Sequence, residues 1–91
     1  MSIKKKIAMI TGVGGFIGSH LADKLLDLGY IVYGTDVRDV EDINNLNETR
    51  KHHSFNFCKG DIRDKIFIDD FFVKEADIIF HLAAVVGVRK Y

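Results

Sequence analysis

The feature that most constrains this 91-residue chain is a group of glycines near its start, Thr11-Gly12-Val13-Gly14-Gly15-Phe16-Ile17-Gly18. An apolar run, Ile7-Ala8-Met9-Ile10, precedes it, and a helical pattern of apolar residues follows it at Ile17, Leu21, Leu25 and Leu28. A strand, a glycine turn and a helix in this order favour a phosphate-binding site. The free N–H groups at the start of the helix can bind the phosphate, and the glycines leave room for it. The chain is therefore expected to bind a dinucleotide.

The glycines follow the spacing Gly12-x-x-Gly15-x-x-Gly18. Gly12 permits a tight turn out of the strand, and Gly15 leaves room for a pyrophosphate against the backbone. Gly18 allows the helix to pack close to the sheet. The pattern G-x-x-x-x-G-K-[ST] is absent from the sequence, so the turn is not expected to be a nucleoside-triphosphatase loop.

An acid follows at the end of the second expected strand. Asp36 lies eighteen residues after Gly18, where a carboxylate accepts hydrogen bonds from the adenosine ribose. This carboxylate repels a 2′-phosphate, so NAD is expected rather than NADP. Arg38 instead favours NADP, although its side chain could also stack on adenine or pair with Asp39. The alternative for Asp36 is a solvated acid at a strand end.

The rest of the chain alternates between strand and helix patterns. The expected strands cover 3–11, 30–36, 54–58 and 77–84, and the expected helices cover 15–28, 39–50 and 64–73. The alternation predicts an α/β fold, a partial Rossmann fold with a four-stranded parallel sheet in the order 3-2-1-4 and helices on both faces. The helix over 39–50 is expected to be short and frayed, because asparagines interrupt the spacing of Val40, Ile43 and Leu46. A ligand is expected between the carboxyl ends of strands 1 and 4.

Composition indicates which partners and which cellular setting are expected for the chain. Thirteen basic and thirteen acidic residues balance to zero net charge, so no nucleic-acid partner is expected. No apolar run reaches the length of a membrane span, and glycines interrupt the one that could resemble a secretory signal. A lone Cys58, expected in the core, favours a reducing cytoplasmic setting. A metal site at His52, His53 and Cys58 is not expected, because adjacent histidines should point in different directions and no fourth ligand follows.

Three ordered stretches resemble one known family: the glycine turn, Gly60-Asp61-Ile62-Arg63-Asp64, and His81-Leu82-Ala83-Ala84 with Gly87-Val88-Arg89. Together they are similar to the NAD-dependent epimerase/dehydratase family, the extended short-chain dehydrogenases/reductases that act on nucleotide sugars. The resemblance implies that Asp61 binds the adenine amino group and that Ile62 packs on its ring. It implies that the Phe16 and Ile17 amides face the phosphates, that the fourth strand approaches the cofactor, and that Arg89 lies near phosphates. The expected cofactor residues are thus Gly12, Gly15, Phe16, Ile17, Gly18, Asp36, Arg38, Asp61, Ile62, Leu82, Ala83 and Ala84.

The family's catalytic pair is missing from this sequence. Members use Tyr-x-x-x-Lys with a Ser or Thr, whereas Tyr30 is followed at the fourth position by Gly34 and Tyr33 by Val37. Residues 1–91 are therefore expected to be a truncated NAD(P)-binding Rossmann domain of order βαβαβαβ, without a substrate domain, a catalytic residue or turnover. A nucleotide-sugar substrate is expected only for the full-length parent. The alternatives are a structural module that forms a homo-oligomer through the exposed edge of strand 4, and a part of an NADP-dependent extended reductase.

Overall fold

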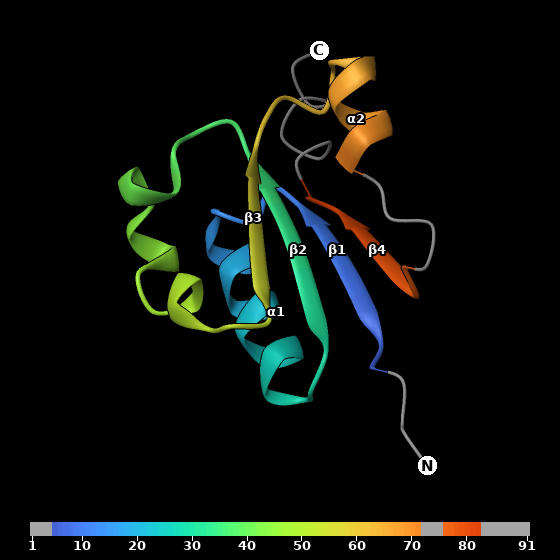
Figure 1. Cartoon of the computed structure of the whole chain (residues 1–91). Coiled ribbons are helices and arrows are strands. Elements are labelled where there is room, and N and C mark those ends of the chain that lie inside the picture. Colours follow the sequence, from blue (N-terminus) through green and yellow to red (C-terminus); the bar gives the residue numbers. More distant parts are fainter. Residues whose placement is uncertain (1–4, 72–75, 83–91) are drawn as a thin grey trace.

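Four parallel strands form a single sheet in the computed structural model, which describes residues 5–71 and 76–82 (Figure 1). The strands are β1 (Ile7–Thr11), β2 (Ile31–Asp36), β3 (Phe55–Lys59) and β4 (Ile78–His81). Their order is β3-β2-β1-β4, and every neighbouring pair is parallel. The predicted fold class and strand order are confirmed.

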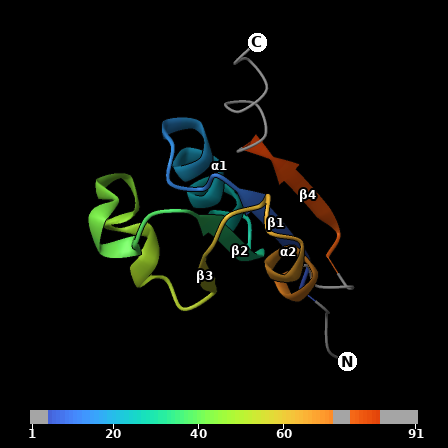
Figure 2. The ribbon, with the colours of Figure 1, turned by 90° about the horizontal axis from the view of Figure 1, so that it is seen from above.

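The register brings the carboxyl ends of the strands to one edge, which Figure 2 views from above. Thr11 at the end of β1 lies opposite Thr35 of β2 and opposite His81 of β4. Asp36 at the end of β2 lies opposite Lys59 of β3. Residues that follow the strands therefore meet at this edge, on either side of the central β1.

Helix α1 (Phe16–Asp27) covers one face of the sheet and supplies much of the core. Its buried residues are Gly18, Ser19, Ala22, Leu25 and Leu26. The predicted stripe was wrong at its two ends, because Ile17 and Leu28 are exposed. Gly29 then ends the helix with a φ of 93°, a conformation that favours glycine.

The segment predicted as a helix over 39–50 forms three short 3₁₀ turns instead. They are η1 (Val40–Asp42), η2 (Asn44–Leu46) and η3 (Thr49–Lys51). Ile43 and Leu46 are buried in the core cluster, and Val40 packs against it. Ile43 itself lies between η1 and η2 with extended backbone angles of −106° and 97°, so the segment buries these residues from separate short turns rather than from one helix face.

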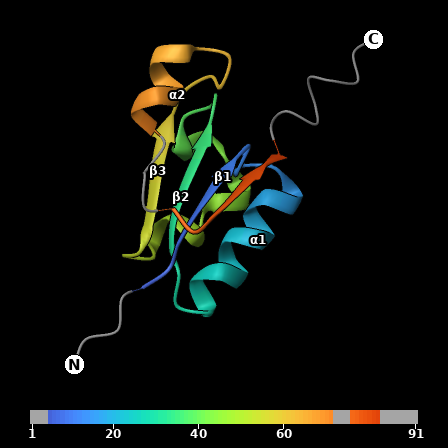
Figure 3. The ribbon, with the colours of Figure 1, turned by 90° about the vertical axis from the view of Figure 1, so that its right-hand side faces the viewer.

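Helix α2 (Lys65–Phe71) lies on the other side of the sheet from α1, as Figures 2 and 3 both show. Asp64 caps it, because its Oδ1 accepts the N–H of Ile66 at 3.0 Å. The rings of Phe67 and Phe71 stack, and Phe71 is buried. This agrees with the predicted helices on both faces; the part of the predicted helix beyond Phe71 lies outside the described residues.

Strand β4 lies at one end of the sheet, and Ile78 and Ile79 are 39% and 44% exposed, which agrees with the predicted exposed edge of strand 4. It is shorter than predicted, because it covers four residues rather than 77–84. Likewise, β1 starts at Ile7, and Lys5 and Lys6 precede it rather than belonging to it. Within residues 5–71 and 76–82, no helix has the length and apolar character to cross a bilayer.

Candidate functional site

The glycine turn is fixed to the sheet by backbone hydrogen bonds. Gly12 has a φ of 71°, and the N–H groups of Gly12 and Val13 both donate to the carbonyl oxygen of Thr35, at 2.9 and 3.0 Å. The N–H of Gly15 donates to the Gly12 carbonyl at 3.2 Å. These bonds join the turn after β1 to the end of β2, so the turn and the β2 terminus form one rigid corner.

Missing side chains let helix α1 start close to this corner. A Cβ at Gly18 would lie 2.6 Å from the Gly12 carbonyl oxygen and 2.9 Å from the Cα of Val13, which is closer than real contacts allow. A Cβ at Gly15 would lie 3.6 Å from its nearest neighbour, the Gly12 oxygen. Gly18 is therefore required for packing, whereas the space beside Gly15 is open.

The first turn of α1 presents unbonded amides at the same place. Gly15 is the N-cap and supplies no side-chain cap, and the first amide that bonds back is that of Ser19, to the Gly15 oxygen at 2.9 Å. The amides of Phe16, Ile17 and Gly18 have no carbonyl one turn earlier to bond. No acidic residue lies in this turn, so the positive end of the helix dipole is not neutralised. The Phe16 and Ile17 side chains are 70% and 68% exposed.

Asp36 faces the glycine turn from the end of β2. Its side chain is only 6% exposed, and its Oδ2 accepts the N–H of Gly14 at 3.0 Å. Burial raises the pKa of this carboxyl, but hydrogen bonds from Arg38 and Gly14 outweigh that effect and hold the pKa below its ordinary value. Asp36 is therefore a buried, ionised carboxylate beside the turn.

Arg38 binds Asp36 rather than the partner considered from the sequence. Its backbone N–H and its Nε donate to Oδ1 at 3.2 and 3.0 Å, and its Nη2 donates to Oδ2 at 3.2 Å. The possible pair of Arg38 with Asp39 was wrong, because Asp39 pairs with Lys59 at 3.2 Å. Two residues of separation allow both the backbone and the guanidinium of Arg38 to reach the same carboxylate.

A second Asp-x-Arg pair lies after β3. Arg63 donates to Asp61 through its backbone N–H at 2.9 Å and through its guanidinium, with Nη2 at 2.6 Å from Oδ2. The hydrogen bond from the Arg63 side chain lowers the pKa of Asp61 to about 2. The Gly60 N–H donates to the Asp36 carbonyl at 2.9 Å, which holds this loop against the end of β2. Asp61 and the half-buried Ile62 thus follow the same edge as Asp36.

Two residues of this corner were not among the predicted cofactor residues. Gly14 donates to Asp36, and its carbonyl accepts the Nδ2 of Asn45 at 3.1 Å. A Cβ at Gly14 would lie 2.7 Å from the Asp36 Oδ2 and 2.8 Å from the Arg38 Nη2, so a larger residue here would force these side chains to move. The two adjacent glycines in the sequence could have indicated a role for Gly14. The contact of Asn45 could not be predicted, because it depends on how the 3₁₀ turns fold.

Several other predicted residues are placed differently or lie outside the described part. Leu82 directly follows β4 and packs against the core, whereas Ala83, Ala84 and Arg89 lie outside the described residues. Cys58 is exposed rather than in the core. The rings of His52 and His53 stack with centroids 5.1 Å apart, so the expectation that they point apart was wrong. No group of three metal-ligating side chains occurs among the residues that the structure describes.

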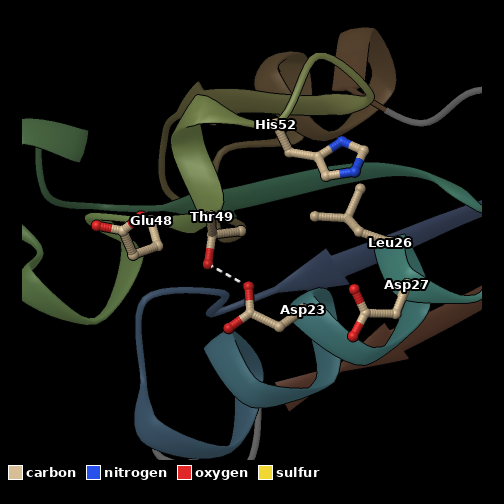
Figure 4. Close-up of a pocket in the computed structure, with 6 residues that line it drawn as sticks. All are labelled: Asp23, Leu26, Asp27, Glu48, Thr49 and His52. Carbon is tan, nitrogen blue, oxygen red and sulfur yellow. Dashed lines mark hydrogen bonds between the residues drawn. The ribbon is translucent and has the colours of Figure 1, made fainter.

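A separate hollow lies between the second half of α1 and η3 (Figure 4). It is lined by Asp23, Leu26, Asp27, Glu48, Thr49 and His52. The Thr49 hydroxyl donates to Asp23 Oδ1 at 2.5 Å across it. None of the predicted cofactor residues lines this hollow, so it is distinct from the corner at the glycine turn.

Comparison with known proteins assigns the chain to one family. The profile of the family described as GDP-mannose 4,6 dehydratase matches residues 9–91. UDP-glucose 4-epimerase of Mycolicibacterium smegmatis is 37% identical over 82 residues, which is 90% of this chain and 26% of that protein.

Solved structures are similar to this chain over most of its length. The Bordetella bronchiseptica enzyme WbmH in complex with NAD⁺ matches with a TM-score of 0.72 at 30% identity, covering 86% of this chain and 26% of WbmH. Yeast methylglyoxal/isovaleraldehyde reductase Gre2, complexed with NADPH, matches with a TM-score of 0.67 at 25% identity, covering 82% and 26%. The chain therefore spans about a quarter of the length of each of these relatives.

Proposed function

Since the chain belongs to the family described as GDP-mannose 4,6 dehydratase, among the NAD-dependent epimerases and dehydratases, we propose that it binds a dinucleotide at the corner formed by the glycine turn and Asp36. In this proposal the amides of Phe16, Ile17 and Gly18 hold the pyrophosphate, and Asp36 accepts a hydrogen bond from the adenosine ribose. Asp61 and Ile62 bind the adenine.

One observation supports this proposal most strongly: an uncapped helix start and a buried carboxylate share one corner. The free amides and the helix dipole suit a phosphate, and the open space beside Gly15 lets a bulky anion approach the backbone. The pKa of Asp36 lies below its ordinary value, so the carboxylate is charged at neutral pH and can accept a charge-assisted hydrogen bond from a ribose hydroxyl. The cofactor, when bound, would supply hydride transfer, and these residues would bind and orient it.

We propose NAD rather than NADP, because the negative Asp36 disfavours a 2′-phosphate. Isothermal titration calorimetry of the chain with NAD and with NADP tests both statements. NAD should bind more tightly, and Asp36→Asn should weaken NAD binding about tenfold, since a charge-assisted hydrogen bond is lost. Asp39→Asn, which removes an equal charge from an exposed neighbour, is the matched control and should leave NAD binding unchanged. Absence of heat at millimolar NAD would refute the proposed site.

For the activity of a protein of the relatives' length, we propose epimerisation or dehydration of a nucleotide sugar. The tyrosine and lysine that would carry this chemistry are absent from the sequence, so residues 1–91 alone should show no turnover. A reductase that uses NADP is the second candidate, and the match to the NADPH complex of Gre2 favours it. The ratio of NAD to NADP affinity distinguishes the two.

We also propose that the 91-residue chain self-associates through β4 and that it works in a reducing cytoplasm. The exposed Ile78 and Ile79 support the first statement, and the single exposed thiol of Cys58 fits the second. Sedimentation velocity should give a species larger than 10.3 kDa at high concentration. Ile79→Lys should restore the monomer, and a wild-type chain that stays monomeric would refute the association.

A further inference from the structure

The Asp36 carboxylate has no free acceptor position in this structure. A carboxylate offers about four lone-pair positions, two on each oxygen. Here Oδ1 accepts the backbone N–H and the Nε of Arg38, and Oδ2 accepts the Gly14 N–H and the Nη2 of Arg38. The group proposed to bind the ribose is thus fully occupied by donors of the chain itself.

The donors differ in how easily they can leave. The Gly14 and Arg38 backbone amides belong to the corner, which is held by the bonds between the turn and β2. The Arg38 side chain is 51% exposed, against 6% for Asp36, so its guanidinium can move into water at little cost. Withdrawal of the guanidinium frees one position on each carboxylate oxygen, and both backbone donors remain.

We propose that the Arg38 side chain is an internal ligand of the ribose site, which competes with a ribose hydroxyl for the Asp36 carboxylate. This inference rests on the proposed dinucleotide site and adds a residue that sets its affinity and specificity. The guanidinium released from Asp36 is a natural partner for a 2′-phosphate, because its planar fork matches phosphate oxygens. Arg38 therefore weakens NAD binding and narrows the preference for NAD over NADP.

Gly14 makes this arrangement possible. A Cβ at this position would meet Asp36, Arg38 and Ile43 at 2.7, 2.8 and 2.9 Å. The guanidinium can therefore lie against the glycine turn only because Gly14 has no side chain.

The test measures NAD and NADP binding to Arg38→Gln by isothermal titration calorimetry. Loss of the competitor should tighten NAD binding about three- to tenfold, the range of a partly exposed bidentate pair, and weaken NADP binding. Arg50→Gln removes an exposed arginine of η3 and should change neither affinity. An unchanged or weaker NAD affinity in Arg38→Gln overturns the inference; weaker binding would indicate that Arg38 contacts the cofactor directly.

A second measurement does not depend on a variant. The NMR resonance of the Arg38 Nε–H should be protected from solvent exchange in the free chain and should lose that protection when NAD is added. Retained protection at saturating NAD overturns the inference while the proposed site stands. If neither the wild-type chain nor Arg38→Gln gives heat with NAD, the proposed site is refuted, and this inference with it.

Discussion

Replacing Gly15 with aspartate should raise the stability of the chain and lower its affinity for NAD. Gly15 is the N-cap of α1, its backbone angles of −73° and 171° are allowed for any residue, and a Cβ there meets nothing closer than 3.6 Å. Aspartate is a preferred N-cap, and its charge complements the helix dipole. It also reduces the freedom of the unfolded chain relative to glycine.

These three gains amount to about 1–2 kcal/mol in the free energy of unfolding, which corresponds to a rise of roughly 5–15 °C in Tm for a chain of this length. The same carboxylate would bond the amides proposed for the pyrophosphate and would repel its charge. Affinity for NAD should therefore fall at least about tenfold, because like charges about 4 Å apart interact by several kcal/mol near a protein surface.

Circular-dichroism melts and calorimetric titration with NAD measure the two effects in the same sample. Leu28→Asp adds an equal charge at the other end of α1, where the side chain is exposed, and is the matched control. It should lower Tm slightly, because a negative charge is unfavourable at a helix C-terminus, and it should leave NAD binding unchanged. If Gly15→Asp binds NAD as tightly as the wild type, the phosphate does not lie at this helix start. If its Tm falls, the cap geometry is wrong.

Three further predictions concern the glycine turn and the two Asp-x-Arg pairs at the carboxyl edge of the sheet. Gly18→Ala should lower the free energy of unfolding by about 1–3 kcal/mol, because its Cβ would lie 2.6 Å from the Gly12 oxygen, and an unchanged urea midpoint would contradict this close approach. The Asp61 carboxyl should titrate at about 2 by NMR, and Arg63→Gln should move the midpoint toward 3.8; a midpoint near 3.8 in the wild type would exclude the pair. Since the folded pKa of Asp36 lies below the unfolded value of 3.8, its ionisation stabilises the fold above that pH. Melts from pH 5 to 2.5 should therefore show a loss of stability below about pH 3.8 that Asp36→Asn lacks, and parallel curves would refute it.

The sheet and the glycine turn could be predicted from the sequence because each depends on local patterns. Apolar runs separated by helical periods favour parallel strands, and right-handed crossovers leave few possible strand orders. Gly12, Gly15 and Gly18 were recognisable because a turn, an open approach and a close contact each require a residue without a side chain. The positive φ of Gly12 and the clash distance at Gly18 agree with two of those reasons.

The parts that escaped prediction depend on contacts between distant segments. The three-residue spacing of Val40, Ile43 and Leu46 favoured an α-helix face, whereas the structure buries these residues in or beside the core cluster from separate short turns with an extended Ile43 between them. Arg38 had several possible partners nearby in sequence. Its pairing with Asp36 depends on the space that the missing side chain of Gly14 leaves, and this space exists only once the turn has folded.

The position of β1 in the middle of the sheet has a consequence for synthesis of the chain. Its first partner, β2, is complete at Asp36, whereas its second partner, β4, is complete only at His81, about 45 residues later. At about 5–20 residues per second, one side of β1 waits roughly 2–9 s on the ribosome without its neighbour. A nascent chain that holds α1 and the glycine turn during this interval presents an open strand edge, so translation speed between these two residues should influence how much of the product aggregates.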